Sequence, residues 1–583
     1  MTHQVAIFGG GVGGMTAAHE LARVGGSKLE ITIYERNPMP GGKARSFRKA
    51  NSATNGNEPL PGEHGFRFFP GYYRHVIKTM ERIPYPLGGP RARVAGNLVD
   101  APETHFARTT GIALELSNKF PSSVEEIAQI FSFGPEVDIP AKDALRFARR
   151  LRDLLCACDD RRLYEFESIS WFDFTEADLC SDDYRKYLAD GLNQRTVAAS
   201  GKDVSARTVG LTLIRIMNDW LNPGNCIDRV LNGPTSDRWL DPWRDHLVDL
   251  GVRFELDTSL TSLAWSVDEG VTSASVQDTS GASRLVSADS YIVALPMADA
   301  KVVFLTSDMA NHDTGLQGFG VEDHAPLTDD WMNGIQLYLD GPLDLAAGHT
   351  IFVDSPFSLT SISQRQFWDE VDFGQLGDGT VQAILSVDIS DWDTPCACHG
   401  RTAKQMTRAE IKDEVLAQVE EHLAASYPEQ TMPKVLDWFL DPAIVELPAP
   451  MPQTGQRLEN LEGLFINTTS SWQNRPEAVL RDDAGLANLY LASDYVRTST
   501  DLATMEAANE AGRKAARGVL EQMGERKSVR RKVELFDFPE PWFFRAFRVA
   551  DDILFNTPQD AIIPGPPPPQ ARENLPEEWV VTP

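Results

Sequence analysis

The sequence predicts an α/β protein with a Rossmann-like domain assembled from three separated segments and an α+β domain inserted between them. Three observations predict this architecture. Residues 5–35 contain a strand, a glycine turn, a helix and a second strand; residues 241–260 contain a helix and then a strand; residues 489–520 contain a strand and then a helix. Buried strands that alternate with helices are typical of a doubly wound parallel sheet.

Length, composition and charge limit the classes of function. The chain has 583 residues, of which 42% are hydrophobic and 24% charged, a balance typical of globular domains with large cores. Its formal net charge of −29 repels phosphate backbones, so we expect no nucleic-acid partner. No basic leader precedes Val5 and no run of 18 apolar residues occurs, so we expect a cytoplasmic protein.

The cysteines and histidines do not match a known ligand pattern. The six cysteines are Cys156, Cys158, Cys180, Cys226, Cys396 and Cys398. They include two C-x-C pairs, but neither has a partner pair at ligand spacing, and the 11 histidines form no H-E-x-x-H motif. We therefore expect ordinary thiols in a reducing compartment and no metal site.

The N-terminal strand, turn and helix predict a dinucleotide site. An apolar strand at Val5–Phe8 leads into a glycine turn, a helix follows at 15–24, and a strand at 29–34 ends in Glu35, about 20 residues after the last glycine. The glycines of the fingerprint are Gly9, Gly11, Gly13 and Gly14. A merely structural glycine turn is the alternative, but the strand, helix and acid together favour dinucleotide binding.

Each part of this fingerprint has a physical role. Gly9 makes the tight turn, Gly11 lets the backbone approach a diphosphate, and Gly14 lets helix and strand pack closely. The N–H groups at the helix N-terminus bind the diphosphate, and Glu35 accepts hydrogen bonds from ribose hydroxyls. NAD and FAD share this pattern, so the fingerprint leaves the choice between them open.

A cationic glycine loop follows the second strand. Its residues, together with the arginine before it, are Arg36, Gly42, Lys43, Ala44 and Arg45. The diphosphate of FAD needs such charge neutralisation, and the glycines let the loop close over it. The alternative is a solvated basic turn.

Two segments near the N-terminus carry a family resemblance. The stretch E-R-N-P-M-P-G-G-K-A-R-S at 35–46 resembles the second FAD-contacting motif of the flavin amine oxidase and phytoene desaturase superfamily. The stretch 65–73, which begins with Gly65, is similar to the aromatic segment of plant- and cyanobacterial-type phytoene desaturases. Arg67 stands where the desaturase pattern has histidine. A guanidinium cannot act as an ordinary base, so we expect Arg67 to orient substrate or flavin as a cation.

The C-terminal segment resembles the last flavin motif of the same superfamily. The strand at 489–493 ends in Asp494, and a helix is expected over 502–520. The resemblance implies that Asp494 lies near the ribityl and diphosphate groups. It also implies that three residues lie under the isoalloxazine ring: Met505, Glu506 and Ala507. Helix capping or a surface position is the alternative for the two acids.

The middle segment resembles the family's central FAD segment. A helix is expected over 241–250, strands over 251–260 and 290–296, and the resemblance implies that the backbone near Leu260 holds the adenine. The predicted FAD-binding domain comprises 1–100, 225–300 and 455–525. The predicted substrate domain comprises 101–224 and 301–454, and a basic and aromatic tail comprises 526–583.

Within the substrate domain, helices are expected over 147–156, 204–221 and 411–423 and strands over 331–339 and 381–387. The polar loop 467–477, just before the last flavin segment, is a candidate for lining the flavin face. An ordinary turn is the alternative.

The resemblance implies an FAD-dependent oxidoreductase that moves hydride from carbon of a small hydrophobic substrate, for example a carotenoid-like isoprenoid, to flavin N5. No cysteine lies near Asp494, so we expect non-covalent FAD. No second G-x-G-x-x-G follows a strand, so we expect an external electron acceptor, oxygen or a quinone. Three alternatives stay open: amine oxidation, redox-neutral isomerisation, and a non-catalytic lipid carrier resembling GDP-dissociation inhibitors.

The tail combines a basic cluster at 526–532 with an aromatic-rich segment at 541–555. Such a pair is typical of helices that lie on membranes, so peripheral membrane contact is one hypothesis. The other is that the aromatic residues pack on the protein's own body, which the net charge favours. The final segment with Pro566–Pro569 is expected to be extended.

Overall fold

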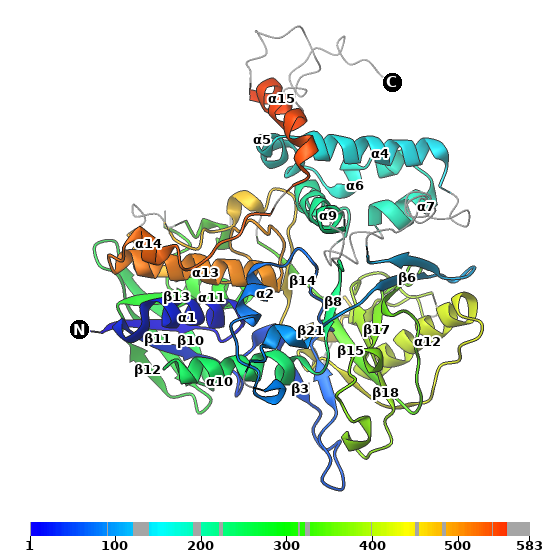
Figure 1. The fold of residues 1–583 in the computed structure, drawn as a ribbon, viewed down its shortest axis with the longest axis horizontal. Coiled ribbons are helices and arrows are strands. Elements are labelled where there is room, and N and C mark those ends of the chain that lie inside the picture. The colour runs from blue at the N-terminus through cyan, green and yellow to red at the C-terminus, as the bar shows by residue number, and fades with distance from the viewer. Residues whose placement is uncertain are drawn as a thin grey trace.

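The computed structural model describes residues 2–89, 91–119, 139–190, 200–220, 226–312, 315–320, 327–397, 399–448, 454–480, 485–538 and 540–556. The predicted Pro566–Pro569 segment lies outside them. One five-stranded sheet has the order β23 (Leu489–Leu491), β13 (Ser290–Val293), β1 (His3–Phe8), β2 (Leu29–Tyr34), β9 (Arg253–Glu255), with all neighbours parallel (Figure 1). Strands from all three predicted segments thus lie in one sheet, which confirms the Rossmann-like α/β fold.

The central strand β1 is apolar and buried from Val5 to Phe8 because both faces of the sheet are covered there. Val5 and Ile7 belong to one core cluster, whereas Ala6 and Phe8 belong to a second cluster on the opposite face. The first face packs under α1 (Val12–Gly25), α13 (Met505–Gln522) and α10 (Asp241–Asp249). The second face packs under α11 (Met297–Thr306) and the antiparallel strands β10 (Thr258–Ser266), β11 (Gly270–Asp278) and β12 (Ser283–Val286).

The single strand expected over 251–260 is wrong. Asp257 has a φ of 55°, in the left-handed region that aspartate tolerates better than most residues, and it separates β9 from β10. The chain therefore leaves the parallel sheet at Asp257 and enters the antiparallel one.

A second sheet of seven strands forms most of the inserted α+β domain. Its order is β19 (Val435–Leu440), β15 (Asn333–Leu339), β18 (Ala383–Ile389), β17 (Thr360–Ser363), β16 (Gly348–Phe352), β6 (Glu103–Ala107), β7 (Leu114–Ser117). The β16–β6 pair is parallel and the other neighbouring pairs are antiparallel. Helix α12 (Arg408–Ser426) packs Ile411, Val415 and Val419 against this sheet.

A group of helices between residues 141 and 220 forms what we call the cap (Figure 1). It comprises α4 (Ala141–Cys156), α5 (Asp159–Arg161), α6 (Trp171–Phe174), α7 (Asp182–Tyr184) and α9 (Ala206–Trp220). Its apolar core contains Trp171 and Val209, and it also includes Leu502 from the C-terminal segment. The C-terminal helix α15 (Arg545–Asn556) packs against α4 and α5.

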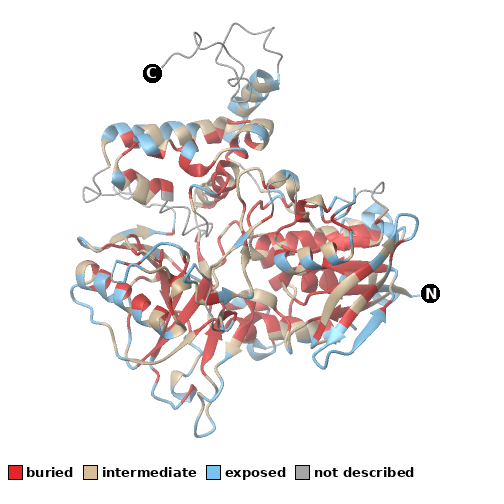
Figure 2. Ribbon diagram, turned by 180° about the vertical axis from the view of Figure 1, so that it is seen from behind, coloured by how far each residue is buried: buried red, intermediate tan, exposed pale blue. Residues whose placement is uncertain are grey.

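Short elements complete the described fold: β3 (Ser46–Arg48), β4 (Pro61–Glu63), α2 (His75–Met80), β5 (Leu98–Asp100), β8 (Arg229–Leu231), β14 (Asp329–Asp330), β20 (Ile444–Glu446), β21 (Leu458–Asn460), β22 (Leu464–Phe465) and α14 (Lys527–Arg530). Figure 2 shows both sheets with their strands largely buried. Among the described residues, no helix combines the length and apolarity needed to cross a membrane.

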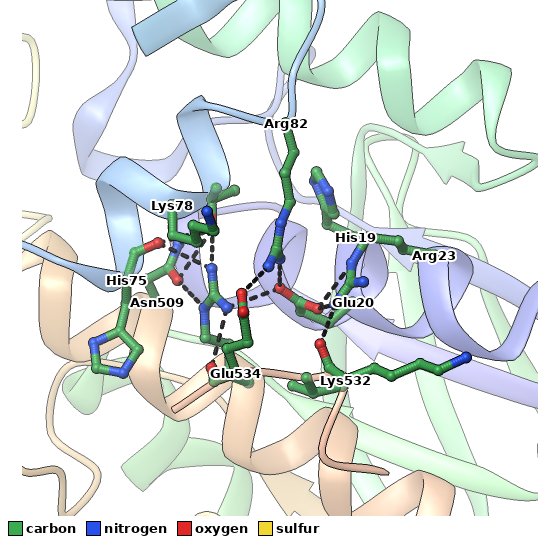
Figure 3. Close-up of polar contacts among 12 residues, drawn as sticks. His19, Glu20, Arg23, His75, Lys78, Arg82, Asn509, Lys532 and Glu534 are labelled. Atoms are coloured by element: carbon green, nitrogen blue, oxygen red, sulfur yellow. Dashed lines mark hydrogen bonds and ion pairs between the residues drawn. The ribbon is translucent and has the colours of Figure 1, made fainter. Parts of the chain in front are cut away.

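A buried ion network joins distant parts of the chain (Figure 3). Glu20 on α1 is fully buried and lies 2.6 Å from Arg82 Nη1 and 3.0 Å from Arg513 Nη1. Arg513 also donates to the carbonyl of Glu534, and Arg23 donates to the carbonyl of Lys532 at 2.6 Å. The network therefore fixes α1, α13 and the beginning of the tail to one another.

Candidate functional site

A cavity of about 560 Å³ opens at the carboxyl ends of the parallel strands. Phe8 and Gly9, Glu35, Ala294 and Ala492, which lie at or just beyond the ends of four neighbouring strands, all line it. In open α/β sheets this edge is where ligands bind. From there the cavity continues to the seven-stranded sheet, which contributes Asp388.

The glycine turn at one end, which we call the glycine end, leaves no room for side chains at Gly9, Gly13 and Gly14. Gly9 has a φ of 108°, and a Cβ on Gly13 would lie 1.8 Å from the carbonyl oxygen of Ala492. Gly9, Gly11 and Gly13 line the cavity. Gly14 does not, because it packs against the turn itself: its Cβ would lie 2.0 Å from the carbonyl oxygen of Gly9. The fingerprint therefore presents backbone, rather than side chains, to the cavity.

Glu35 is buried beside this turn. Its carboxylate accepts hydrogen bonds from the backbone N–H of Gly10 at 2.7 Å and from the backbone and side chain of Asn37 at 2.9 and 2.7 Å. A carboxylate has about four acceptor positions, so about one remains for a ribose hydroxyl. Leu260 lines the same part of the cavity, with Val302. These residues fit the adenosine half of a dinucleotide.

The predicted cationic loop faces the glycine turn across the cavity. A Cβ on Gly42 would lie 3.0 Å from the Cα of Gly11, so two glycine backbones oppose each other there. Four residues of this loop and the preceding Arg36 line the cavity: Arg36, Gly42, Lys43, Ala44 and Arg45.

The cations of the loop have protein partners. Arg36 lies 2.9 Å from Asp299, Arg45 lies 2.9 Å from Glu462, and Lys43 donates to the carbonyl of Gly463. A fully solvated basic turn is therefore wrong for this loop. The pairing holds the loop in place over the cavity.

The start of α13 brings only part of the predicted C-terminal motif to the cavity. Asp494 and Met505 line it. On a helix, Met505 and Ala508 share a face, and both line the cavity, whereas Glu506 and Ala507 point elsewhere. Of the three residues expected under the isoalloxazine ring, Met505 lines the cavity, whereas Glu506 and Ala507 do not.

Glu506 has another role, which its burial explains. Its carboxylate accepts hydrogen bonds from the backbone N–H groups of Arg74, His75 and Val76 at 2.7 to 2.9 Å. These are the first N–H groups of α2, so Glu506 caps that helix from α13. The C-terminal motif therefore supports the site through α2 as well as lining it.

The opposite end of the cavity, which we call the chamber end, contains Gly65 and Arg67. The Arg67 guanidinium donates to the carbonyl oxygen of Gly65 at 2.6 Å and to that of Lys43. It is thereby held at the cavity wall as a fixed cation. The role of Arg67 as an orienting cation stays a prediction, and no described contact gives Arg67 a proton-transfer role.

Asp388 on β18 faces the chamber end and was not predicted from the sequence. Its Oδ1 accepts a hydrogen bond from the Phe66 N–H at 3.2 Å. The carboxyl lies in a notch between two glycines, because a Cβ on Gly65 or on Gly334 would lie 2.8 or 3.0 Å from Oδ1. Burial raises the pKa of Asp388 to about 7, although the Arg67 charge opposes the shift. A carboxyl with this pKa can both hold and release a proton near neutral pH.

A second titratable pair lies close by. His64 lines the cavity, and its Nδ1 contacts the buried carboxylate of Asp441. Burial alone raises the pKa of Asp441, but the adjacent His64 lowers it below its ordinary value. Asp441 also accepts from Asn333 Nδ2. The pair orients the His64 ring at the cavity wall.

One signal in the sequence could have revealed Asp388: it is the acid in an otherwise apolar and neutral strand, A-I-L-S-V-D-I. An acid inside a fully buried strand needs a functional or structural partner. His64 directly precedes Gly65 of the aromatic segment, but nothing local distinguishes it.

The polar loop 467–477 does not line the cavity. It packs on the cap instead: the Trp472 N–H donates to Glu167 at 2.9 Å, and the Ser205 N–H donates to the carbonyl of Asn467 at 3.0 Å. Within the described part of the chain, no group of His, Cys, Asp or Glu is arranged to hold a metal. The described cysteines are free thiols.

Comparisons with known proteins agree with this geometry. The family model for flavin-containing amine oxidoreductases matches residues 12–312 and 358–520. No curated protein matches the sequence.

Solved structures share the fold at low identity. Cyclohexylamine oxidase from Brevibacterium oxydans IH-35A has a TM-score of 0.57 at 13% identity, covering 90% of this chain and 100% of its own. An oxidoreductase from Methanosarcina mazei has a TM-score of 0.53 at 13% identity (89% and 100%). A putrescine oxidase variant has a TM-score of 0.52 at 12% identity (89% and 99%).

The family model covers well over half of the chain, and its matched residues include Gly13 and Gly14 of the fingerprint, Glu35, the cationic loop and the start of α13. The chain therefore belongs to the family of flavin-containing amine oxidoreductases.

Proposed function

We propose that this protein is an oxidoreductase that holds FAD without a covalent bond and removes hydride from carbon of a neutral, hydrophobic substrate. The observation that carries this proposal is the make-up of the chamber end. Its wall is apolar around the fixed cation of Arg67, the buried carboxyl of Asp388 and the His64 ring; the apolar residues are Phe66, Phe68, Met332, Leu464 and Leu502. Such a wall suits an apolar substrate and excludes water.

The glycine end supports FAD as the cofactor. Opposed glycine backbones, a buried acceptor at Glu35 and the first turn of α1 form a cradle that added Cβ atoms would fill. When bound, FAD supplies the two-electron acceptor. Among the described residues that line the cavity there is no cysteine, which supports a non-covalent cofactor. The electrons would then pass to an external acceptor, oxygen or a quinone.

Asp388 is the residue we assign to proton transfer at the chamber end. Its carboxyl faces the cavity, has one described hydrogen bond to the protein, and has a pKa of about 7. Arg67 lies at the same wall and disfavours a cationic substrate through charge repulsion. We therefore prefer a neutral substrate to a protonated amine.

Anaerobic mixing of the purified protein with apolar polyenes tests the proposal. We expect the visible absorbance of oxidised flavin to bleach with at least one substrate of this class. Absence of bleaching across the class would contradict the substrate part of the proposal.

Amine oxidation is the second candidate, because an ionised Asp388 could bind an ammonium group and because two structures of similar fold are named as amine oxidases. Its test is peroxide release in air from cyclohexylamine and putrescine. We expect no release above a substrate-free control. A turnover comparable to that with apolar substrates would favour the amine.

A further inference from the structure

We propose that α15 and α4 together form a surface that binds anionic lipid bilayers. The surface, here called the outer cap face, consists of exposed apolar residues of the tail and exposed cations of α4: Trp542, Phe543, Phe547, Leu554, Lys142, Arg149 and Arg152. This binding stands on its own geometry and does not depend on which substrate the chamber end takes.

The tail uses its polar groups to dock on the cap. Asp551 accepts from the backbone N–H of Cys158 at 2.8 Å and from Arg161 Nε at 3.0 Å. Just before the helix, Glu540 pairs with the buried Arg162 at 2.7 Å. These contacts hold α15 in a fixed orientation against α5 and the end of α4.

This orientation turns apolar side chains outward. Trp542 is 83% exposed, Phe547 59% and Leu554 58%, and Figure 2 shows α15 as largely exposed. The hypothesis that the tail aromatics pack on the protein's own body is therefore wrong for Trp542 and Phe547. It holds for Phe544, which packs against the cap core. Asp551 is turned toward the cap, and Asp552 is exposed, but most of the exposed residues of α15 are apolar, which suits an interface.

The cations of this surface come from α4. This helix carries five Lys or Arg residues and two Asp in a chain of net charge −29. Lys142, Arg149 and Arg152 are exposed, and Leu145 between them is 54% exposed. Their spacing of seven and three places them along one stripe of the helix. The stripe is complementary in charge to anionic headgroups.

The basic cluster predicted to accompany the aromatic segment lies elsewhere. Residues 526–532 form α14 and its flanks, which pack beside α13 of the Rossmann-like domain and away from α15 (Figure 1). Their closeness in the sequence favours contact between the basic cluster and the aromatic segment. In the fold, however, α14 packs on the Rossmann-like domain and α15 packs on the cap.

The acidic remainder of the protein makes the orientation specific. Most of its surface repels an anionic bilayer, so attraction concentrates where cations and aromatics coincide. The cap core beneath this face includes Leu502, which also lines the chamber end. Binding through the outer cap face would therefore hold the chamber end on the bilayer side of the molecule.

Flotation of the full-length protein with vesicles of phosphatidylcholine, with and without 30% phosphatidylglycerol, tests the proposal. We expect flotation with the anionic vesicles, weakened by high salt. The variant W542S/F547S should lose at least about tenfold in partitioning, since two exposed aromatic anchors are removed. V267S/L285S is the matched control, because it removes exposed apolar residues (67% and 71%) from the Rossmann-like domain.

Two double variants, each of which removes two cations, test which cations bind the bilayer. R149Q/R152Q should lose about fivefold in partitioning for each cation removed. R526Q/K527Q makes the same charge change on α14 and should bind like the parent. Three results would overturn the proposal: no flotation of the parent chain, equal losses in the two charge variants, or a parent that self-associates through these residues and does not bind vesicles.

Discussion

The glycine end and the chamber end of the cavity are built by different means. At the glycine end, backbones approach each other so closely that Gly9, Gly13 and Gly14 cannot carry side chains. At the chamber end, ionisable side chains such as Asp388 and Arg67 converge from strands and loops far apart in the chain. The first end is therefore sensitive to volume and the second to charge.

The largest expected effect comes from adding volume at the glycine end. In Gly13→Ala the new Cβ meets the Ala492 carbonyl, which belongs to the end of a central strand. We expect a loss of more than about 4 kcal/mol in the free energy of unfolding and no bound flavin. Gly96→Ala, whose Cβ meets nothing within 4 Å, is the control. The flavin-to-protein absorbance ratio and thermal unfolding measure both; a yellow, stable Gly13→Ala protein would refute the steric account.

The next effect is one of charge at the chamber end. A carboxyl whose pKa is raised by folding binds its proton more tightly in the folded state. The wild type therefore loses stability as the pH rises from about 4 to about 7, by up to about 4 kcal/mol from Asp388. Asp388→Asn cannot ionise, so its stability relative to wild type should increase over this range. Thermal unfolding at several pH values measures the difference; a difference independent of pH would contradict the assignment.

A third prediction tests whether Glu506 stabilises α2 or contacts the flavin. Glu506→Gln weakens the cap of α2 and should cost about 2 kcal/mol in unfolding free energy. Because Glu506 does not line the cavity, the flavin content should stay at the wild-type level. Glu521→Gln, an exposed acid on the same helix, is the control and should change neither quantity. Loss of flavin without loss of stability would restore the role that the family motif implies.

The smallest expected effect comes from the interaction between Arg67 and Asp388 at the chamber end. Arg67 lowers the pKa of Asp388, so Arg67→Met should raise that pKa further above its ordinary value. In Arg67→Met, the loss of stability that comes from ionisation of Asp388 would then continue to a higher pH than in the wild type. Arg253→Met, an exposed arginine on β9, is the control. An unchanged range in Arg67→Met would show that the two groups do not interact.

The same contrast explains what could be predicted from the sequence. The glycine turn, Glu35 and the cationic loop are consecutive, and their function depends on local backbone geometry, so the pattern predicts the site. The residues of the motif around Glu506 are also consecutive, but their positions around the helix determine which of them face the cavity. The Glu506 carboxylate binds N–H groups of α2 instead.

The residues of the chamber end could not be predicted from local sequence patterns. Asp388 reaches Phe66 only because β18 pairs with β15 and β15 lies beside the segment around Gly65. Strand order in a seven-stranded mixed sheet does not follow from local pattern. The position of α14 away from α15 has the same cause, since a chain path over the surface is decided by contacts such as Glu534 with Arg82.

We propose that three segments of the chain hold one flavin without a covalent bond. The most direct test of this proposal is an absorbance spectrum of the purified protein, followed by denaturation, filtration and mass measurement of the filtrate. We expect flavin bands on the folded protein and all of the yellow colour in the filtrate, with the mass of FAD. A colourless protein, or colour that stays on the polypeptide, would contradict it.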